Sequence, residues 1–137
     1  MEDSGEFKGW KTWKNEAFER VAAGPFYFTD DEQGIKCAFR AEKHHLNGGG
    51  VVHGGCLMTF ADFSLFAIAH EALDGAFAVT VSFASEFLSG PKLGDLVIAR
   101  GEVLRAGRSL IFVRGLLSVD GQICLNYSGT IKKLTPR

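Results

Sequence analysis

The sequence predicts an α+β domain in which a curved antiparallel sheet wraps around one long, buried helix. The segment from His53 to Leu73 is apolar on nearly every face, so other structure must surround it. The segments that follow alternate apolar residues with smaller or polar ones, as strands with one buried face do. With 137 residues, 46% of them hydrophobic, the chain has the length and composition of a single domain.

The N-terminal part contributes a short helix and a strand. Apolar residues recur at helical spacing over residues 12–23, and Gly24-Pro25 ends that segment. Residues 35–39 then alternate in the period of a strand. We therefore expect a flexible tail over residues 1–10, followed by a single domain over residues 11–137 that carries an extra N-terminal helix.

Turn residues bound the central helix and the strands after it. Gly48-Gly49-Gly50 opens the helix and Asp74-Gly75 closes it. Asp120-Gly121 is a strong hairpin signal. The strands are expected over residues 77–87, 95–104, 110–119 and 122–131. We expect these four strands in hairpin succession, which gives a sheet that is antiparallel for most of its length.

Composition and charge exclude several classes of protein. No apolar stretch is long enough to cross a bilayer and no signal peptide is apparent, so we expect a cytoplasmic protein that does not bind membranes. The net charge is −1, and no basic run extends beyond Lys132-Lys133, which argues against a nucleic-acid partner. The three cysteines and four histidines match no metal-binding spacing, so we predict no metal site.

Asp62 is the candidate catalytic residue, because it is a carboxylate in the middle of a helix whose other central residues are apolar. A carboxylate in a sealed core costs free energy, whereas in a cleft it can act as a general base or nucleophile. The structural alternative is that Asp62 bonds a neighbouring backbone or hydroxyl group. Cys56 is an alternative nucleophile, since a thiol in the first turn of a helix can have a lowered pKa.

The helix start is the second candidate feature. His53-Gly54-Gly55 places backbone N–H groups, unobstructed by side chains, at the positive end of the helix dipole. Such an end can hold a developing oxyanion. The alternative is that the glycines only permit a tight turn or close packing.

The spacing of these residues resembles a known family. Asn47, His53-Gly54-Gly55 and Asp62 form the pattern Asn-x5-His-Gly-Gly-x7-Asp on a loop that leads into a buried helix. This pattern resembles the hotdog-fold thioesterases, specifically the phenylacetate-pathway and 4-hydroxybenzoyl-CoA type. The resemblance covers roughly residues 35–133 and includes the strand order and the turn at Ala106-Gly107-Arg108. It implies the hotdog fold and an acyl-CoA thioesterase that hydrolyses a thioester to free acid and CoA.

The resemblance also implies a role for each residue of the pattern. Asp62 would be the general base or nucleophile. The amide of Gly54, with or without that of Gly55, would polarise the thioester carbonyl. His53 would brace this loop rather than act as the base. Asn47 would orient the substrate or the attacking water.

Residues outside the pattern would complete the site. Thr80, which matches the family by spacing alone, would help to position water. The backbone of Thr80, Val81 and Ser82 would contact the amides of a pantetheine arm, as a strand edge contacts a peptide. The basic turn expected to meet the CoA phosphates contains Arg105, Gly107 and Arg108, with Lys132-Lys133 as a second option. CoA enters as part of the substrate, so no resident cofactor is expected.

Helix geometry predicts that a second chain completes the active site. Gly54 and Asp62 are eight residues apart in sequence, or about 12 Å along a helix axis. The amide and the carboxylate must nevertheless approach the same carbonyl, each within about 3 to 3.5 Å. We therefore predict a homodimer with antiparallel central helices and shared active sites, paired into a homotetramer as in the family.

Two other functions fit the same fold. Hotdog dehydratases or hydratases act on acyl thioesters, but they usually carry a His-Phe-Pro type of signature, which this sequence lacks. A non-catalytic acyl-CoA-binding module would leave Asp62 without an evident purpose. Aromatic acyl groups, such as phenylacetyl, and medium or long aliphatic chains both suit a sequence with 12 phenylalanines. The carrier of the acyl group, CoA or acyl carrier protein, stays open.

Overall fold

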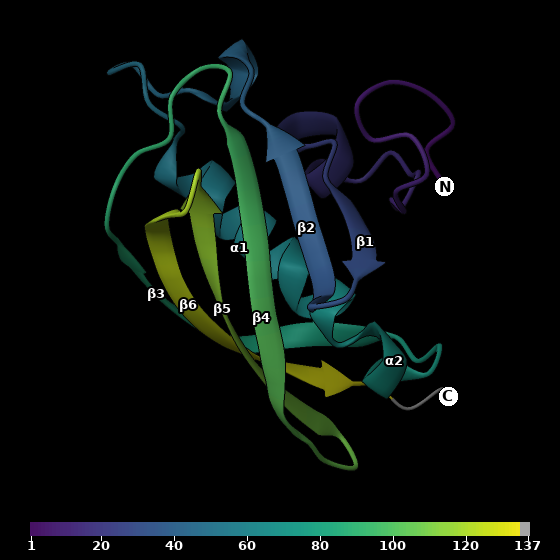
Figure 1. The fold of residues 1–137 in the computed structure, drawn as a ribbon. Coiled ribbons are helices and arrows are strands. Elements are labelled where there is room, and N and C mark those ends of the chain that lie inside the picture. The colour runs from purple at the N-terminus through teal and green to yellow at the C-terminus, as the bar shows by residue number, and fades with distance from the viewer. Residues whose placement is uncertain (135–137) are drawn as a thin grey trace.

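A six-stranded antiparallel sheet curls around helix α1 in the computed structural model, which describes residues 1–134 (Figure 1). The elements in chain order are η1 (Glu19–Ala23), β1 (Tyr27–Asp31), β2 (Gly34–Arg40), η2 (Lys43–His45), α1 (Gly54–Ile68), α2 (His70–Leu73), β3 (Ala78–Phe87), β4 (Leu96–Ala106), β5 (Leu110–Val119) and β6 (Gln122–Lys133). This arrangement confirms the predicted fold class, in which a curved sheet wraps around a long central helix.

The strand order across the sheet is β1-β2-β4-β5-β6-β3. The predicted hairpin succession is confirmed from β4 to β6 and is wrong for β3, which pairs with β6 instead of β4. The chain leaves β3 beside β6, where the Leu88 amide donates to the Cys124 carbonyl oxygen at 2.9 Å, and then crosses to β4. β3 therefore forms the edge of the sheet opposite β1.

Helix α1 is enclosed because glycines on the facing strands let it approach the sheet. A Cβ atom at Gly129 of β6 would lie 2.4 Å from Leu65 Cδ1, and one at Gly101 of β4 would lie 2.9 Å from Ile68 Cδ1. The predicted helix over residues 53–73 is interrupted at Ala69. There the Nδ1 atom of His70 donates to the Ala67 carbonyl oxygen at 2.9 Å and takes the place of a helical partner. None of the helices within residues 1–134 is long and apolar enough to cross a membrane.

Phenylalanines from three elements fill the space between α1 and the first two strands. The rings of Phe39 on β2 and Phe60 on α1 lie 4.8 Å apart, and Phe26 lies 5.0 Å from Phe60. Phe28 and Phe63 extend the cluster at 6.1 Å. These edge-to-face and tilted contacts stabilise the core beyond simple burial. They fix the N-terminal half of the chain against the helix.

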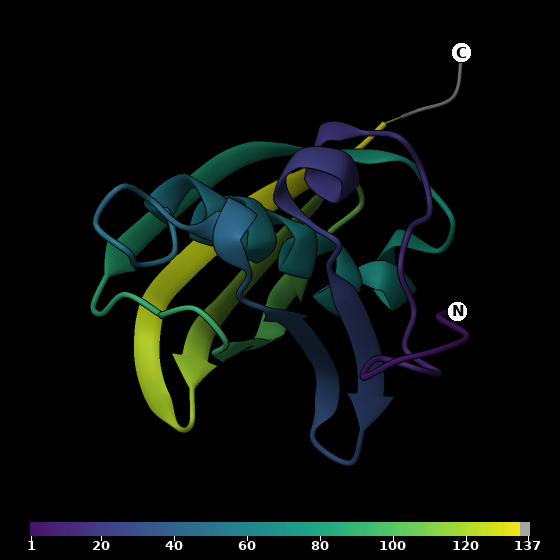
Figure 2. The ribbon, with the colours of Figure 1, turned by 90° about the horizontal axis from the view of Figure 1, so that it is seen from above.

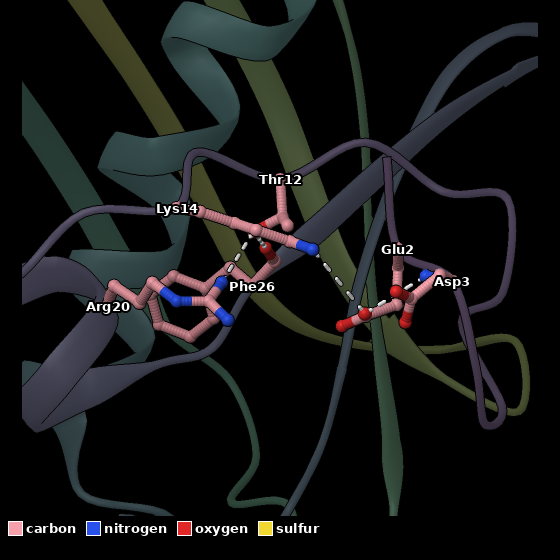
Figure 3. Close-up of polar contacts among 6 residues, drawn as sticks. All are labelled: Glu2, Asp3, Thr12, Lys14, Arg20 and Phe26. Atoms are coloured by element: carbon pink, nitrogen blue, oxygen red, sulfur yellow. Dashed lines mark hydrogen bonds and ion pairs between the residues drawn. The ribbon is translucent and has the colours of Figure 1, made fainter.

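The N-terminal helix is much shorter than predicted: a single turn of π-helix, η1, replaces the helix expected over residues 12–23. The reason is competition from β1, because the backbone of Lys11 pairs with Phe28 through two hydrogen bonds of 2.7 and 2.9 Å. The Thr12 hydroxyl donates to the Phe26 carbonyl oxygen at 2.8 Å (Figure 3). Both contacts hold the start of this segment in an extended form.

Residues 1–10, expected to be a flexible tail, fold back on the domain. The Glu2 amide donates to the Trp10 carbonyl oxygen at 2.7 Å, and the ring of Phe7 stacks on Tyr27 at 4.4 Å. Whether the segment is mobile stays a prediction. Further along, η1 lies alongside α1 (Figure 2).

Candidate active site

Asp62 on α1 and Thr80 on β3 form a directly bonded pair. The Thr80 hydroxyl donates to Asp62 Oδ1 at 2.5 Å, so the fold joins two residues that the sequence nominated separately. Burial raises the pKa of the Asp62 carboxyl, and the hydrogen bond from Thr80 opposes that rise. Asp62 is half-buried rather than sealed in the core. The pair is therefore a partly buried carboxylate with one oriented neighbour.

A β-bulge at Val81 gives β3 an irregular register beside this pair. Thr80 pairs with Ile131 and Ser82 pairs with Thr130, so Val81 has no opposite residue on β6. Val81 and Ser82 are exposed, and β3 is the edge of the sheet. The predicted backbone contacts from Thr80, Val81 and Ser82 to a pantetheine arm fit an edge strand, and they stay a prediction.

The helix start presents one free amide. His53 caps α1, because its Nδ1 atom accepts from the Gly55 amide at 2.8 Å. Within residues 1–134 the Gly54 amide donates to no protein acceptor. Gly54 is therefore the better candidate oxyanion donor, since the Gly55 amide is already engaged.

The two glycines also meet a packing requirement, as the structural alternative proposed. A Cβ atom at Gly54 would lie 3.1 Å from Phe87 Cε1, and one at Gly55 would lie 2.9 Å from His53 Nδ1. Glycine at these positions therefore permits both the helix cap and the approach of β3. Close packing and an exposed amide are compatible, because the amide belongs to the backbone.

Asn47 organises the loop that leads into α1. Its Oδ1 atom accepts from the Gly49 amide at 2.8 Å and from the Val51 amide at 3.3 Å. The side chain is therefore held in place by its oxygen, and its NH2 group has no partner within residues 1–134. Asn47 lies in the loop seven residues before Gly54, the first residue of α1, whereas Asp62 lies eight residues after Gly54. A single chain thus separates the two halves of the predicted site.

A cavity of about 490 Å³ is lined by neighbours of the Asp62–Thr80 pair along α1 and β3, but not by Asp62 or Thr80 themselves. Its wall includes Phe66, one helical turn after Asp62, and Ala78, two residues before Thr80 on the same face of β3. The lining residues are mainly aromatic or apolar, with a few polar ones: Trp13, Asn15, Glu19, Phe66, His70, Leu73, Gly75, Ala76, Phe77 and Ala78. Such a lining suits the acyl part of a ligand.

Glu19 is a second acid near Asp62, and the sequence analysis missed it. Burial, together with the negative charge of Asp62, raises the pKa of Glu19 to about 7. Its position on η1 depends on how the N-terminal segment folds back, so no sequence spacing relates it to Asp62. The same segment contains Glu16, Lys14 and Arg20, so its charges did not single out Glu19.

Cys56 lacks the surroundings of a nucleophile. Burial raises the pKa of its thiol to about 11, so the thiolate is scarce at neutral pH. The Nδ1 atom of its neighbour His53 is occupied by the helix cap. All three cysteines, Cys37, Cys56 and Cys124, are free thiols. Within residues 1–134, no group of three His, Cys, Asp or Glu side chains could hold a metal ion.

The basic turn predicted to bind phosphates connects β4 to β5. The Gly107 amide donates to the Leu110 carbonyl oxygen at 2.8 Å, and Arg105 and Arg108 are exposed. Leu110 pairs with Lys132, which pairs with Val79. The register therefore places the turn at the end of the sheet where β3 begins, the end that carries Thr80. A phosphate contact there stays a prediction.

Comparisons with known proteins identify the family of the chain. The Thioesterase superfamily model matches residues 49–124, more than half of the chain. A Pseudomonas aeruginosa protein named "Putative esterase PA0474" is 31% identical over 108 residues, which are 77% of this chain and 81% of that protein. Human Acyl-coenzyme A thioesterase 13 is 30% identical over 96 residues, or 69% of this chain and 68% of that protein.

A solved structure shares the fold over most of its length. The crystal structure of a hypothetical thioesterase from Streptococcus pneumoniae with coenzyme A superposes with a TM-score of 0.74 at 22% identity, and the match covers 88% of this chain and 94% of that one. The PaaI protein of the E. coli phenylacetic acid degradation operon gives a TM-score of 0.70 at 20% identity, with 80% of each chain covered. The chain therefore belongs to the thioesterase superfamily and is a thioester hydrolase with the hotdog fold.

Proposed function

We propose that the protein hydrolyses acyl-CoA thioesters to a free acid and CoA, with Asp62 as the group that drives hydrolysis. The observation that carries this proposal is the Asp62–Thr80 pair, whose neighbours Phe66 and Ala78 line a cavity with mainly apolar or aromatic residues. Relatives named acyl-coenzyme A thioesterase and structural neighbours crystallised with coenzyme A or acetyl CoA support a CoA thioester as the substrate. CoA then enters and leaves with each turnover and is not a resident cofactor.

Two routes use the same residues. In the first, Asp62 takes a proton from water while the water oxygen bonds to the thioester carbon; the C–S bond breaks, and the CoA thiolate takes the proton. In the second, an Asp62 oxygen attacks the carbon and expels the thiolate, and water hydrolyses the resulting anhydride. In both routes the Gly54 amide stabilises the charge that develops on the carbonyl oxygen. Thr80 orients the carboxylate, and Asn47 holds the substrate or water.

The site requires two chains in this proposal. Gly54 and Asp62 lie on the same helix, about 12 Å apart along its axis, so one helix presents only half of the site to a given carbonyl. The edge strand β3 exposes Val79 and Val81, which are 43% and 53% accessible. An antiparallel homodimer through this edge would bring Gly54 of the partner subunit to Asp62. Two such dimers would form the homotetramer.

The remaining contacts would bind the parts of the CoA thioester that lie beyond the carbonyl. The edge of β3 at Val81 and Ser82 would bind the pantetheine arm, and Arg105 and Arg108 would meet the phosphates, because both arginines are exposed at the same end of the sheet. The Gly107 backbone allows the turn between them. We place this chemistry in the cytoplasm, where CoA thioesters are made and used.

The test is a thiol-release assay across acyl-CoA thioesters with the Asp62→Asn variant. We expect kcat to fall by roughly a thousandfold or more, because the variant loses the base or nucleophile but keeps the shape of the side chain. Asp120→Asn, in the exposed hairpin turn between β5 and β6, is the matched control and should retain activity. Single-turnover hydrolysis in heavy-oxygen water separates the routes, since direct attack leaves label in Asp62.

Three results would overturn the proposal. Loss of turnover in Cys56→Ala with full activity in Asp62→Asn would move the chemistry to the thiol. Hydration of crotonyl thioesters without release of CoA would indicate a hydratase. Binding of acyl-CoA with no turnover would indicate a non-catalytic module.

A further inference from the structure

Glu19 is the acidic member of the cavity beside Asp62, and its carboxylate has no ion-pair or hydrogen-bond partner within residues 1–134. The neighbouring cation, Arg20, is occupied elsewhere: its Nη1 atom donates to the Thr12 hydroxyl at 3.0 Å (Figure 3). None of the Lys and Arg residues among residues 1–134 lines the cavity. Within this part of the chain, the Glu19 carboxylate is therefore not paired with a cation.

The path from Asp62 to Glu19 runs along the cavity wall. Phe66 and His70 follow Asp62 at successive turns of α1 and α2, and both line the cavity together with Glu19. The negative charge of Asp62 raises the pKa of Glu19, so the two carboxyls lie close enough to interact, although Asp62 itself is not part of the cavity wall. An acyl group whose carbonyl lies at Asp62 and whose tail fills this cavity would pass Glu19.

We propose that the cavity receives the acyl group and that Glu19 is a specificity-determining residue, which rejects acyl groups that end in a carboxylate in favour of neutral ones. This inference rests on the proposed function. Two carboxylates in one half-buried cavity repel each other more strongly than in bulk water, since burial reduces the screening of their charges. A neutral acyl tail meets no such repulsion.

The proposal predicts a pH signature. Glu19 changes from neutral to charged near neutral pH, because burial and Asp62 raise its pKa to about 7. Rejection of carboxylates should therefore be weak at pH 6 and strong at pH 8. The other titratable or charged groups that face Glu19 are Asp62 on α1 and His70 on α2, with Arg20 next to it on η1. Substitution of Glu19 alone separates its titration from theirs.

The test measures kcat/KM for matched substrates at both pH values. Butanoyl-CoA is compared with succinyl-CoA, and hexanoyl-CoA with adipoyl-CoA, so each pair has the same carbon count and differs in the terminal carboxylate. At pH 8 we expect the neutral member to be preferred by roughly tenfold more than at pH 6 in at least one pair. The ratio within a pair cancels changes in Asp62 ionisation and in CoA binding.

Glu19→Gln should make this ratio independent of pH and equal to that of the unmodified protein at pH 6. Glu16→Gln, an exposed acid three residues earlier, is the control and should leave the ratio unchanged. A merely structural role of Glu19 would lower the activity towards both substrates alike and leave the ratio intact, which would overturn the assignment. A ratio that does not change with pH in the unmodified protein would also overturn it. Lack of turnover with every thioester would instead contradict the proposed function.

Discussion

Replacement of Thr80 by valine tests whether the Thr80 hydroxyl helps to keep the Asp62 carboxyl ionised. Valine keeps the shape of threonine but removes the hydroxyl that donates to Asp62 Oδ1 at 2.5 Å. A hydrogen bond to a charged group contributes about 1.5 to 3 kcal/mol. That free energy corresponds to roughly 10- to 150-fold in an equilibrium or rate constant. The contact favours the ionised form of Asp62, so its loss raises the pKa of that carboxyl further, in the direction in which burial already moves it.

The assay is the pH profile of kcat/KM for an acyl-CoA that the protein hydrolyses well. The acid limb of Thr80→Val should move to higher pH, and the deficit of the variant should be largest at acid pH, where less Asp62 is ionised. Thr80→Ser keeps the donor and should restore the profile. Thr29→Val on β1, at the opposite edge of the sheet from β3, is the matched control. A deficit that is the same at every pH would refute this reasoning, because Thr80 would then position water without acting on the ionisation of Asp62.

Two further predictions concern stability. Gly129→Ala should lower the free energy of unfolding, measured in urea, by about 1 to 3 kcal/mol, because its Cβ would lie 2.4 Å from Leu65 Cδ1 in a packed core. Gly48→Ala is the control, because a Cβ there meets nothing within 4 Å. Equal losses of stability in the two variants would contradict the packing argument. The two hydrogen bonds from Arg100, at 2.9 and 2.6 Å, lower the pKa of Asp31 to about 2, below its ordinary 3.8. The stabilisation is therefore present above pH 4 and is lost as the pH falls to about 2. The Tm of Asp31→Asn should fall less steeply over this range than that of the unmodified protein, and parallel curves would show that the pair contributes nothing.

Local patterns predicted most of the elements. The strand expected over residues 110–119 matches β5, because alternation and the Asp120-Gly121 turn both mark it. The start of the central helix was predicted within a residue, since the glycines and the apolar run coincide there. β1 was missed because Tyr27–Asp31 is short and has little alternation, and its strand form depends on pairing with β2 and with Lys11.

Long-range pairing was harder to predict than the elements themselves. Alternation in β3 reveals a buried face but not the neighbouring strand, so the sequence could not tell pairing with β6 from pairing with β4. The same limit applied to the site. The motif spacing nominated Asp62 and Thr80, and the structure joined them. Glu19 lies in the segment whose helix was predicted to be longer than η1, and its place in the cavity wall depends on how that segment folds. No sequence motif therefore pointed to it.

The position of β3 beside β6 also constrains how the chain folds. β4 and β5 lie between these two strands in sequence, so β3 emerges from the ribosome well before its only partner strand in the described sheet. Pairing over such a separation is slow, and an unpaired strand with apolar residues is prone to aggregate meanwhile. The sheet closes only when β6 inserts between β5 and β3. Damage within β6 should therefore harm soluble expression more than comparable damage within β1, which needs only the adjacent β2.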